Sequence, residues 1–119
     1  MSAITSELIN AYQNTHYQVL YHLNRHTLRI DEPSEFLINL LNKHDATEAV
    51  YITACNPYSQ STSPIDNKKR LKQLKQDIDN RWIYFEGEGV DPSGEWTPES
   101  SLLVIGMPTD IATELATKY

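Results

Sequence analysis

The stretch AVYITACNPYS at residues 49–59 decides the fold. Residues 49–55 have the continuous apolar and β-branched character of a strand that is covered on both faces. Polar groups enter near the end of this strand, at Thr53, Asn56 and Ser59, with a proline among them. Because Asn, Pro and Ser are common turn formers, the strand is predicted to end at a polar corner.

A helix over residues 64–80 is predicted next, and it has the clearest start signal in the chain. Ser63 can cap it, Pro64 suits its first position, and Asp66 stands where a capping-box partner would be. A helix that follows a buried strand directly, before another strand at 81–87, predicts a crossover whose two strands are parallel.

The other elements follow from hydrophobic periodicity and from turn residues. Together they give the order α-β-β-α-β-α-β-β-α, which predicts one α/β (α+β) sandwich over residues 1–119 with a mixed sheet of about five strands. The remaining predicted elements are helices at 4–12, from Pro33 to His44 and after Pro108, and strands at 17–22, 26–30 and 101–107, the first two joined by Leu23-Asn24-Arg25.

The composition indicates a small globular protein and excludes several classes. The 119 residues are 39% hydrophobic and 22% charged, and no apolar run is long enough for a membrane helix. A formal net charge of −6 argues against nucleic acid as a partner. One cysteine excludes an internal disulfide, and neither a metal nor another cofactor is indicated. The N-terminus lacks a signal-peptide pattern, so a cytoplasmic location is expected.

The buried stripe of the 64–80 helix contains an irregularity that points to a site. Leu71, Leu74 and Ile78 recur at spacings of three and four residues. Extended towards the helix start, the stripe reaches Asn67 and Arg70 instead of apolar residues. These two side chains are therefore expected at the edge of the core, facing the sheet, and a broken local rule is a reason to suspect a site. The neighbouring lysines Lys68, Lys69, Lys72 and Lys75 are expected to form a solvated face.

Topology predicts that several polar segments meet near this helix start. If the strands at 49–55 and 81–87 are parallel and 101–107 returns antiparallel, two strand ends and one strand start share an end of the sheet. The predicted ligand-binding residues are Thr53, Asn56, Ser59, Asn67, Arg70, Gly87, Gly89, Trp96, Glu99 and Ser101. If the site is catalytic, Glu99 and Glu88 are the candidate general bases.

The motifs resemble one known family. ITACNPYS at 52–59, Asn67, Arg70 and the stretch from Gly87 to Val104 follow one another in order. They are similar to the small bacterial proteins grouped as domain of unknown function 3293, which carry ITAxNPxS and GEGxDPxGxWxExS-like elements. The likeness extends from about Tyr12 to Gly106. It implies a cytoplasmic bacterial protein without an established activity.

Two functions remain open from the sequence. The first is binding of a small polar or anionic ligand, nucleotide-like or carboxylate-like, with Arg70 contacting a carboxylate or phosphate. The second is a protein–protein interaction or regulatory module, an adaptor or a bacterial or phage defence-related protein. In this alternative the polar cluster is structural, and the acidic segment at 86–99 supplies the contact with a basic partner.

Overall fold

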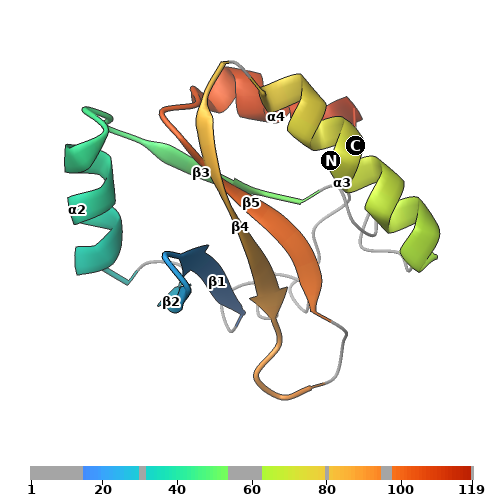
Figure 1. The fold of residues 1–119 in the computed structure, drawn as a ribbon, viewed down its shortest axis with the longest axis horizontal. Helices are drawn as coiled ribbons and strands as arrows, with labels where there is room; N and C mark the ends of the chain where they lie inside the picture. The colour runs from blue at the N-terminus through green and yellow to red at the C-terminus, as the bar shows by residue number, and fades with distance from the viewer. Residues whose placement is uncertain (1–14, 30–31, 54–62, 80, 95–97, 119) are drawn as a thin grey trace.

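The computed structural model describes residues 15–29, 32–53, 63–79, 81–94 and 98–118. The helix expected at 4–12 lies outside these residues. Figure 1 shows the arrangement of the described elements and gives the labels that we use. These elements are β1 (His16–Tyr21), β2 (Asn24–Leu28), α2 (Glu35–Lys43), β3 (Ala49–Ile52), α3 (Pro64–Ile78), β4 (Ile83–Val90), β5 (Glu99–Ile105) and α4 (Thr109–Lys118).

The five strands form one sheet in the order β2-β1-β4-β5-β3. Each neighbouring pair is antiparallel, so the mixed sheet expected from the sequence is wrong. The physical reason is the place of β5, which inserts between β3 and β4 and is antiparallel to both. The crossover through α3 still makes β3 and β4 parallel to each other, as expected, although they are not neighbours. The α+β class and the single five-stranded sheet are confirmed.

Helices cover both faces of the sheet, which explains why β5 is so apolar. On one face, Leu102 and Val104 of β5 pack with Leu74 and Ile78 of α3 and with Ala112 of α4. On the other face, the alternate residues of β5 pack with Leu40 of α2. Successive side chains of a strand point to opposite faces, so one continuous apolar run can serve both cores. Accordingly, α3 and α4 lie together in Figure 1, apart from α2.

Local signals fix where α2 and α3 begin. The Ser63 hydroxyl accepts a hydrogen bond from the Asp66 amide at 3.2 Å, and Pro64 is the first helical residue, as predicted. In α2 the cap is Ser34, whose hydroxyl accepts from the Leu37 amide at 3.1 Å. Pro33 therefore precedes the cap, and its expected place in the first helical turn is wrong.

The β1–β2 hairpin is tighter than expected. Tyr21 pairs with Asn24, so the loop consists of His22 and Leu23 alone and Arg25 belongs to β2. Both loop residues have positive φ, 47° for His22 and 66° for Leu23. This is the conformation of a type I′ turn. The expected three-residue connection missed this turn because neither His nor Leu is a usual residue at such positions.

The strand predicted at 81–87 begins and ends later, at Ile83–Val90. Its last residues pair with β1 on one side and β5 on the other, so the first part of GEGVDPSG is regular strand and not loop. No helix within the described ranges is long and apolar enough to cross a membrane.

Candidate functional site

Three strands meet at one end of the sheet, which we call the polar end. Here β3 and β4 finish and β5 begins. Thr53, directly after β3, donates a hydrogen bond from Oγ1 to the main-chain oxygen of Ser100 at 2.8 Å. Gly89 near the end of β4 pairs with Glu99 at the start of β5. The structure thus brings together the three pieces of chain that the sequence assigned to a common end.

The first half of α3 is directed towards the polar end. Only a short turn separates the end of α3 from the start of β4, so the helix runs back along that strand. Lys75 of α3 forms an ion pair with Glu86 of β4, so this part of the helix lies beside the strand. Because an α-helix rises about 1.5 Å per residue, Arg70 lies roughly 7.5 Å from Lys75 along the helix axis, towards the start of α3.

The burial of α3 follows the predicted stripe. Asn67 and Arg70 are half-buried, while Lys68, Lys69 and Lys72 on the other side of the helix are exposed. The side chains or main chains of both Asn67 and Arg70 also interact with other groups of the protein. Lys75 departs from the expected solvated face, since its ion pair with Glu86 leaves its side chain only 30% exposed.

Ser101 is one of the predicted ligand-binding residues, but its hydroxyl has an internal role. The residue is 3% exposed, and its Oγ donates to the main-chain oxygen of Glu99 at 3.0 Å. This hydrogen bond satisfies a buried polar group at the first residues of β5. Glu99 itself is half-buried at the polar end.

The two glycines of the predicted site, Gly87 and Gly89, differ in whether a side chain would fit at their position. A Cβ at Gly87 would collide with the main-chain oxygen of Gln18, so only glycine permits β1 and β4 to approach there. At Gly89 the nearest atom to such a Cβ is Thr15 Cγ2 at 3.9 Å, an ordinary contact. Gly87 is therefore required by the sheet itself, whereas Gly89 is not.

Tyr51 of β3 is a polar-end residue that the sequence analysis did not identify. Its Oη donates to the main-chain oxygen of Gln18 on β1 at 2.9 Å, and its ring contacts Tyr17 edge-on with centroids 5.1 Å apart. Burial raises the pKa of Tyr51 above its usual value, against a smaller lowering by a hydrogen bond with Ser101. The phenol is thus a neutral hydrogen-bonding group that joins strands far apart in the sheet.

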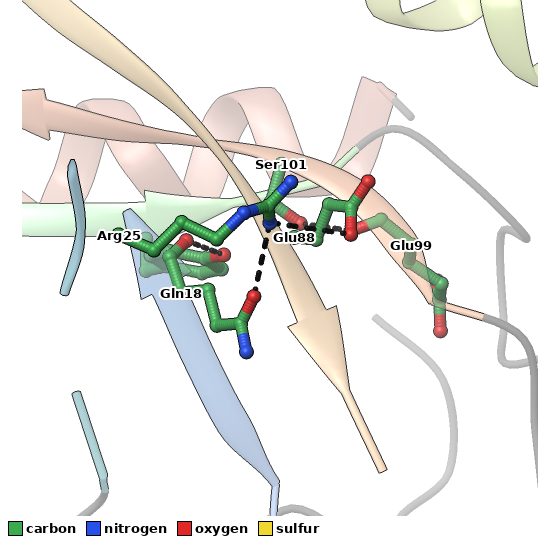
Figure 2. A network of polar contacts seen from close by, with 6 residues as sticks. Gln18, Arg25, Glu88, Glu99 and Ser101 are labelled. Atoms are coloured by element: carbon green, nitrogen blue, oxygen red, sulfur yellow. Dashed lines mark hydrogen bonds and ion pairs between the residues drawn. The ribbon is translucent and has the colours of Figure 1, made fainter. Parts of the chain in front are cut away.

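A second group of polar side chains was also missed. Arg25 of β2 donates from Nη1 to Oε1 of Gln18 at 3.0 Å and lies 3.7 Å from Oε2 of Glu88. Figure 2 shows the guanidinium reaching across β1 to Glu88 on β4. Glu88, a candidate general base, is therefore held in an ion pair, with 42% of its side chain exposed. The sequence analysis did not predict this ion pair, because it placed Arg25 in the hairpin loop and not in β2.

Part of the predicted site falls outside the described residues. Asn56, Ser59 and Trp96 are in this position, so their expected roles remain predictions. Within the described part of the chain, no group of three His, Cys, Asp or Glu side chains is arranged to hold a metal ion.

Comparison with known proteins gives a family and no further relatives. Neither the curated proteins nor the solved structures include a match to this chain. The model of one family, described as "Protein of unknown function (DUF3293)", matches residues 52–119. This match contains α3, β4, β5, α4 and most of the polar end, but neither Tyr51 nor the rest of the resemblance from Tyr12 on. Since the match spans more than half of the 119 residues, the chain belongs to the DUF3293 family.

Proposed function

We propose that the protein binds a small polar or anionic ligand, nucleotide-like or carboxylate-like, at the polar end of the sheet. The observation that carries the proposal is the position of Arg70. It is half-buried on the core side of α3, in the half of the helix directed towards the meeting point of β3, β4 and β5. Arg70 already takes part in an interaction within the chain. Its guanidinium has several N–H donors in a planar fork, so a carboxylate or phosphate can bind beside that interaction.

Each remaining residue of the proposed site has a distinct role. Asn67, one turn before Arg70, presents an amide from the same side of α3, and Thr53 presents a hydroxyl at the end of β3. Asn56 and Ser59 are proposed to add hydrogen bonds, and Trp96 is proposed to stack on a ring of the ligand. Gly89 leaves the surface of β4 without a side chain beside Glu99.

The ion pairs at this end favour ligand binding over the interaction module. That alternative needs free acidic charge on residues 86–99 to attract a basic partner. Glu86 is paired with Lys75 and Glu88 with Arg25, so part of this charge is neutralised within the chain. Binding of a ligand by Arg70 does not depend on those acids.

The test is a thermal-shift screen of the full chain against nucleotides and carboxylate metabolites. A ligand of the proposed class should raise Tm, and Arg70→Ala should remove the shift while the circular dichroism spectrum stays unchanged. Lys69→Ala is the matched control, because Lys69 is the adjacent cation on the exposed side of the same helix turn. Its variant should retain the full shift.

Two results would contradict the proposal. The first is a folded wild-type protein with no hit in the screen, which would favour the interaction module. The second is a hit that survives Arg70→Ala with unchanged affinity, which would place the ligand elsewhere.

A further inference from the structure

The end of the sheet opposite the polar end contains an open depression of about 360 Å³, which we call the Arg81 depression. This volume lies in the range of small-molecule sites. It is formed where β3 and β4 begin and β5 ends. The length of β5, roughly 20 Å, therefore separates it from the polar end. Its lining includes His44, Asp45, Glu48, Arg81, Trp82 and Gly106.

One wall is the turn that ends α2, and its backbone is fixed. The amide of Ala46 donates to the Leu41 oxygen at 2.9 Å, and the amide of Asp45 donates to the Asn42 oxygen at 3.3 Å. Asp45 has a φ of 52°. Together these features form a Schellman motif, in which aspartate occupies the place usually taken by glycine. The carboxylate of Asp45 is thereby attached to a rigid turn and not to a free loop.

The opposite wall is the turn between α3 and β4. The amides of Arg81 and Trp82 both donate to the Ile78 oxygen, at 3.1 and 3.3 Å. The guanidinium carbon of Arg81 lies 4.3 Å from the centre of the Trp82 ring. A guanidinium stacked in this way uses its flat face for the ring and keeps its N–H edge available for an anion.

The floor is fixed as well. The Gly106 amide donates to the main-chain oxygen of Glu48 at 2.8 Å, which ties the end of β5 to the segment before β3. Gly106 has a φ of 81°, a conformation that favours glycine. Both walls and the floor therefore have hydrogen-bonded backbones, which fix the turns that line the depression.

The charged side chains that line the depression, Asp45, Glu48 and Arg81, are exposed to solvent. In the described ranges, the side chains of Asp45, Glu48 and Arg81 form no ion pair with one another or with any other residue. A purely anionic ligand would face two carboxylates, and a purely cationic one would face the guanidinium. A ligand that carries both charges can satisfy both kinds of group.

We infer that the Arg81 depression is a second binding site, specific for a small zwitterion that carries an ammonium and a carboxylate. The carboxylate binds the N–H edge of Arg81, and the ammonium binds the carboxylates of Asp45 and Glu48. Amino acids and the ends of short peptides belong to this chemical class. The site is independent of Arg70 and of the ligand proposed for the polar end.

The test uses the fluorescence of Trp82. The chain has two tryptophans, so Trp96→Phe leaves Trp82 as the only indole. Titration of this protein with ω-amino acids from glycine to aminohexanoate should give a saturable change for at least one length. The carboxylic acid and the amine of the same length should bind at least tenfold more weakly, because each lacks one charge-assisted interaction.

Variants then assign the two charges. Arg81→Gln and Glu48→Gln should each weaken binding of the best amino acid by roughly tenfold or more. Arg29→Gln is the matched control, since Arg29 is an exposed arginine outside the depression that pairs with Glu32 at 3.0 Å. Its affinity should equal that of the parent protein.

The inference is overturned if no amino acid of the series produces a saturable change. It is also overturned if the matched amine or acid binds as well as the zwitterion, or if Arg81→Gln binds normally. The NMR chemical shift of the Gly106 amide reports on the same site independently. It should change on titration with the same affinity as the fluorescence of Trp82.

Discussion

The two ends of the sheet differ in how their polar side chains interact. At the polar end, side chains form hydrogen bonds or ion pairs within the protein. In the Arg81 depression, the charged side chains have no ion-pair partner among the described residues. Thr53, Tyr51 and Ser101 each hydrogen-bond to a main-chain oxygen of another segment or of their own strand. At the opposite end, backbone hydrogen bonds fix the turns that carry the charged groups. Substitutions of Thr53, Tyr51 or Ser101 should therefore reduce stability, whereas substitutions in the depression should affect binding more than stability.

The largest effect is expected for Gly87→Ala. The new methyl group would overlap the main-chain oxygen of Gln18, so β1 and β4 would have to separate. We expect a loss of about 2–3 kcal/mol in the free energy of unfolding, measured by urea denaturation. Gly89→Ala is the control and should cost less than about 1 kcal/mol, since its methyl group meets Thr15 Cγ2 at an ordinary 3.9 Å. Equal losses would remove the distinction between the two glycines.

A smaller loss is expected for Tyr51→Phe. This change removes the hydrogen bond to the Gln18 oxygen at 2.9 Å but keeps the ring and its contact with Tyr17. The expected cost is about 1 kcal/mol in the free energy of unfolding. A neutral result would show that the hydroxyl does not hold β3 and β1 together, and that the polar end is less tightly bonded than its geometry indicates.

Alkaline pH should affect the same hydroxyl. The pKa of Tyr51 is raised in the folded protein, so folding favours the neutral phenol. Its contribution to stability is complete below the unfolded pKa of about 10 and is lost as the pH rises above that value. Between about pH 9 and pH 11 the wild type should lose up to about 1 kcal/mol more than Tyr51→Phe. Identical pH profiles would contradict the burial of this group.

The smallest effect is expected for the ion pair of Arg25 and Glu88. The side chains are 59% and 42% exposed and 3.7 Å apart, so solvent screens their attraction. A double-mutant cycle with Arg25→Gln and Glu88→Gln should give a coupling energy of about 0.2–1 kcal/mol, which decreases at high salt. A larger and salt-independent coupling energy would mean that this ion pair stabilises the polar end as much as the hydrogen bonds of Tyr51 and Thr53 do.

Much of the fold could be predicted because its signals are local. The apolar run of β3 and the Ser63-Pro64 start of α3 each report on neighbouring residues only. The stripe on α3 also gave the half-buried positions of Asn67 and Arg70 correctly. The β1–β2 turn was not predicted, because His22 and Leu23 adopt positive φ, whereas such turns usually contain Asn, Asp or Gly.

The sequence predicted that β3, β4 and β5 meet at one end of the sheet, but it did not predict most of the contacts there. The direction rule for a strand–helix–strand crossover was sufficient to bring Thr53, Gly89 and Glu99 to one end. The roles of Tyr51 and Arg25 depend on which strands are neighbours, and no local pattern contains that information. The same holds for the Arg81 depression, whose walls come from two turns far apart in the chain.

By itself, the sequence determined the type and order of the described strands and helices, because hydrophobic period and capping residues act over a few positions. It also determined that β3 and β4 would be parallel. Only the tertiary structure decided that β5 lies between them, that Gly87 must be glycine, and that Asp45 and Glu48 line an open depression together with Arg81. These features arise from contacts between distant residues, and such contacts exist only once the order of the strands is fixed.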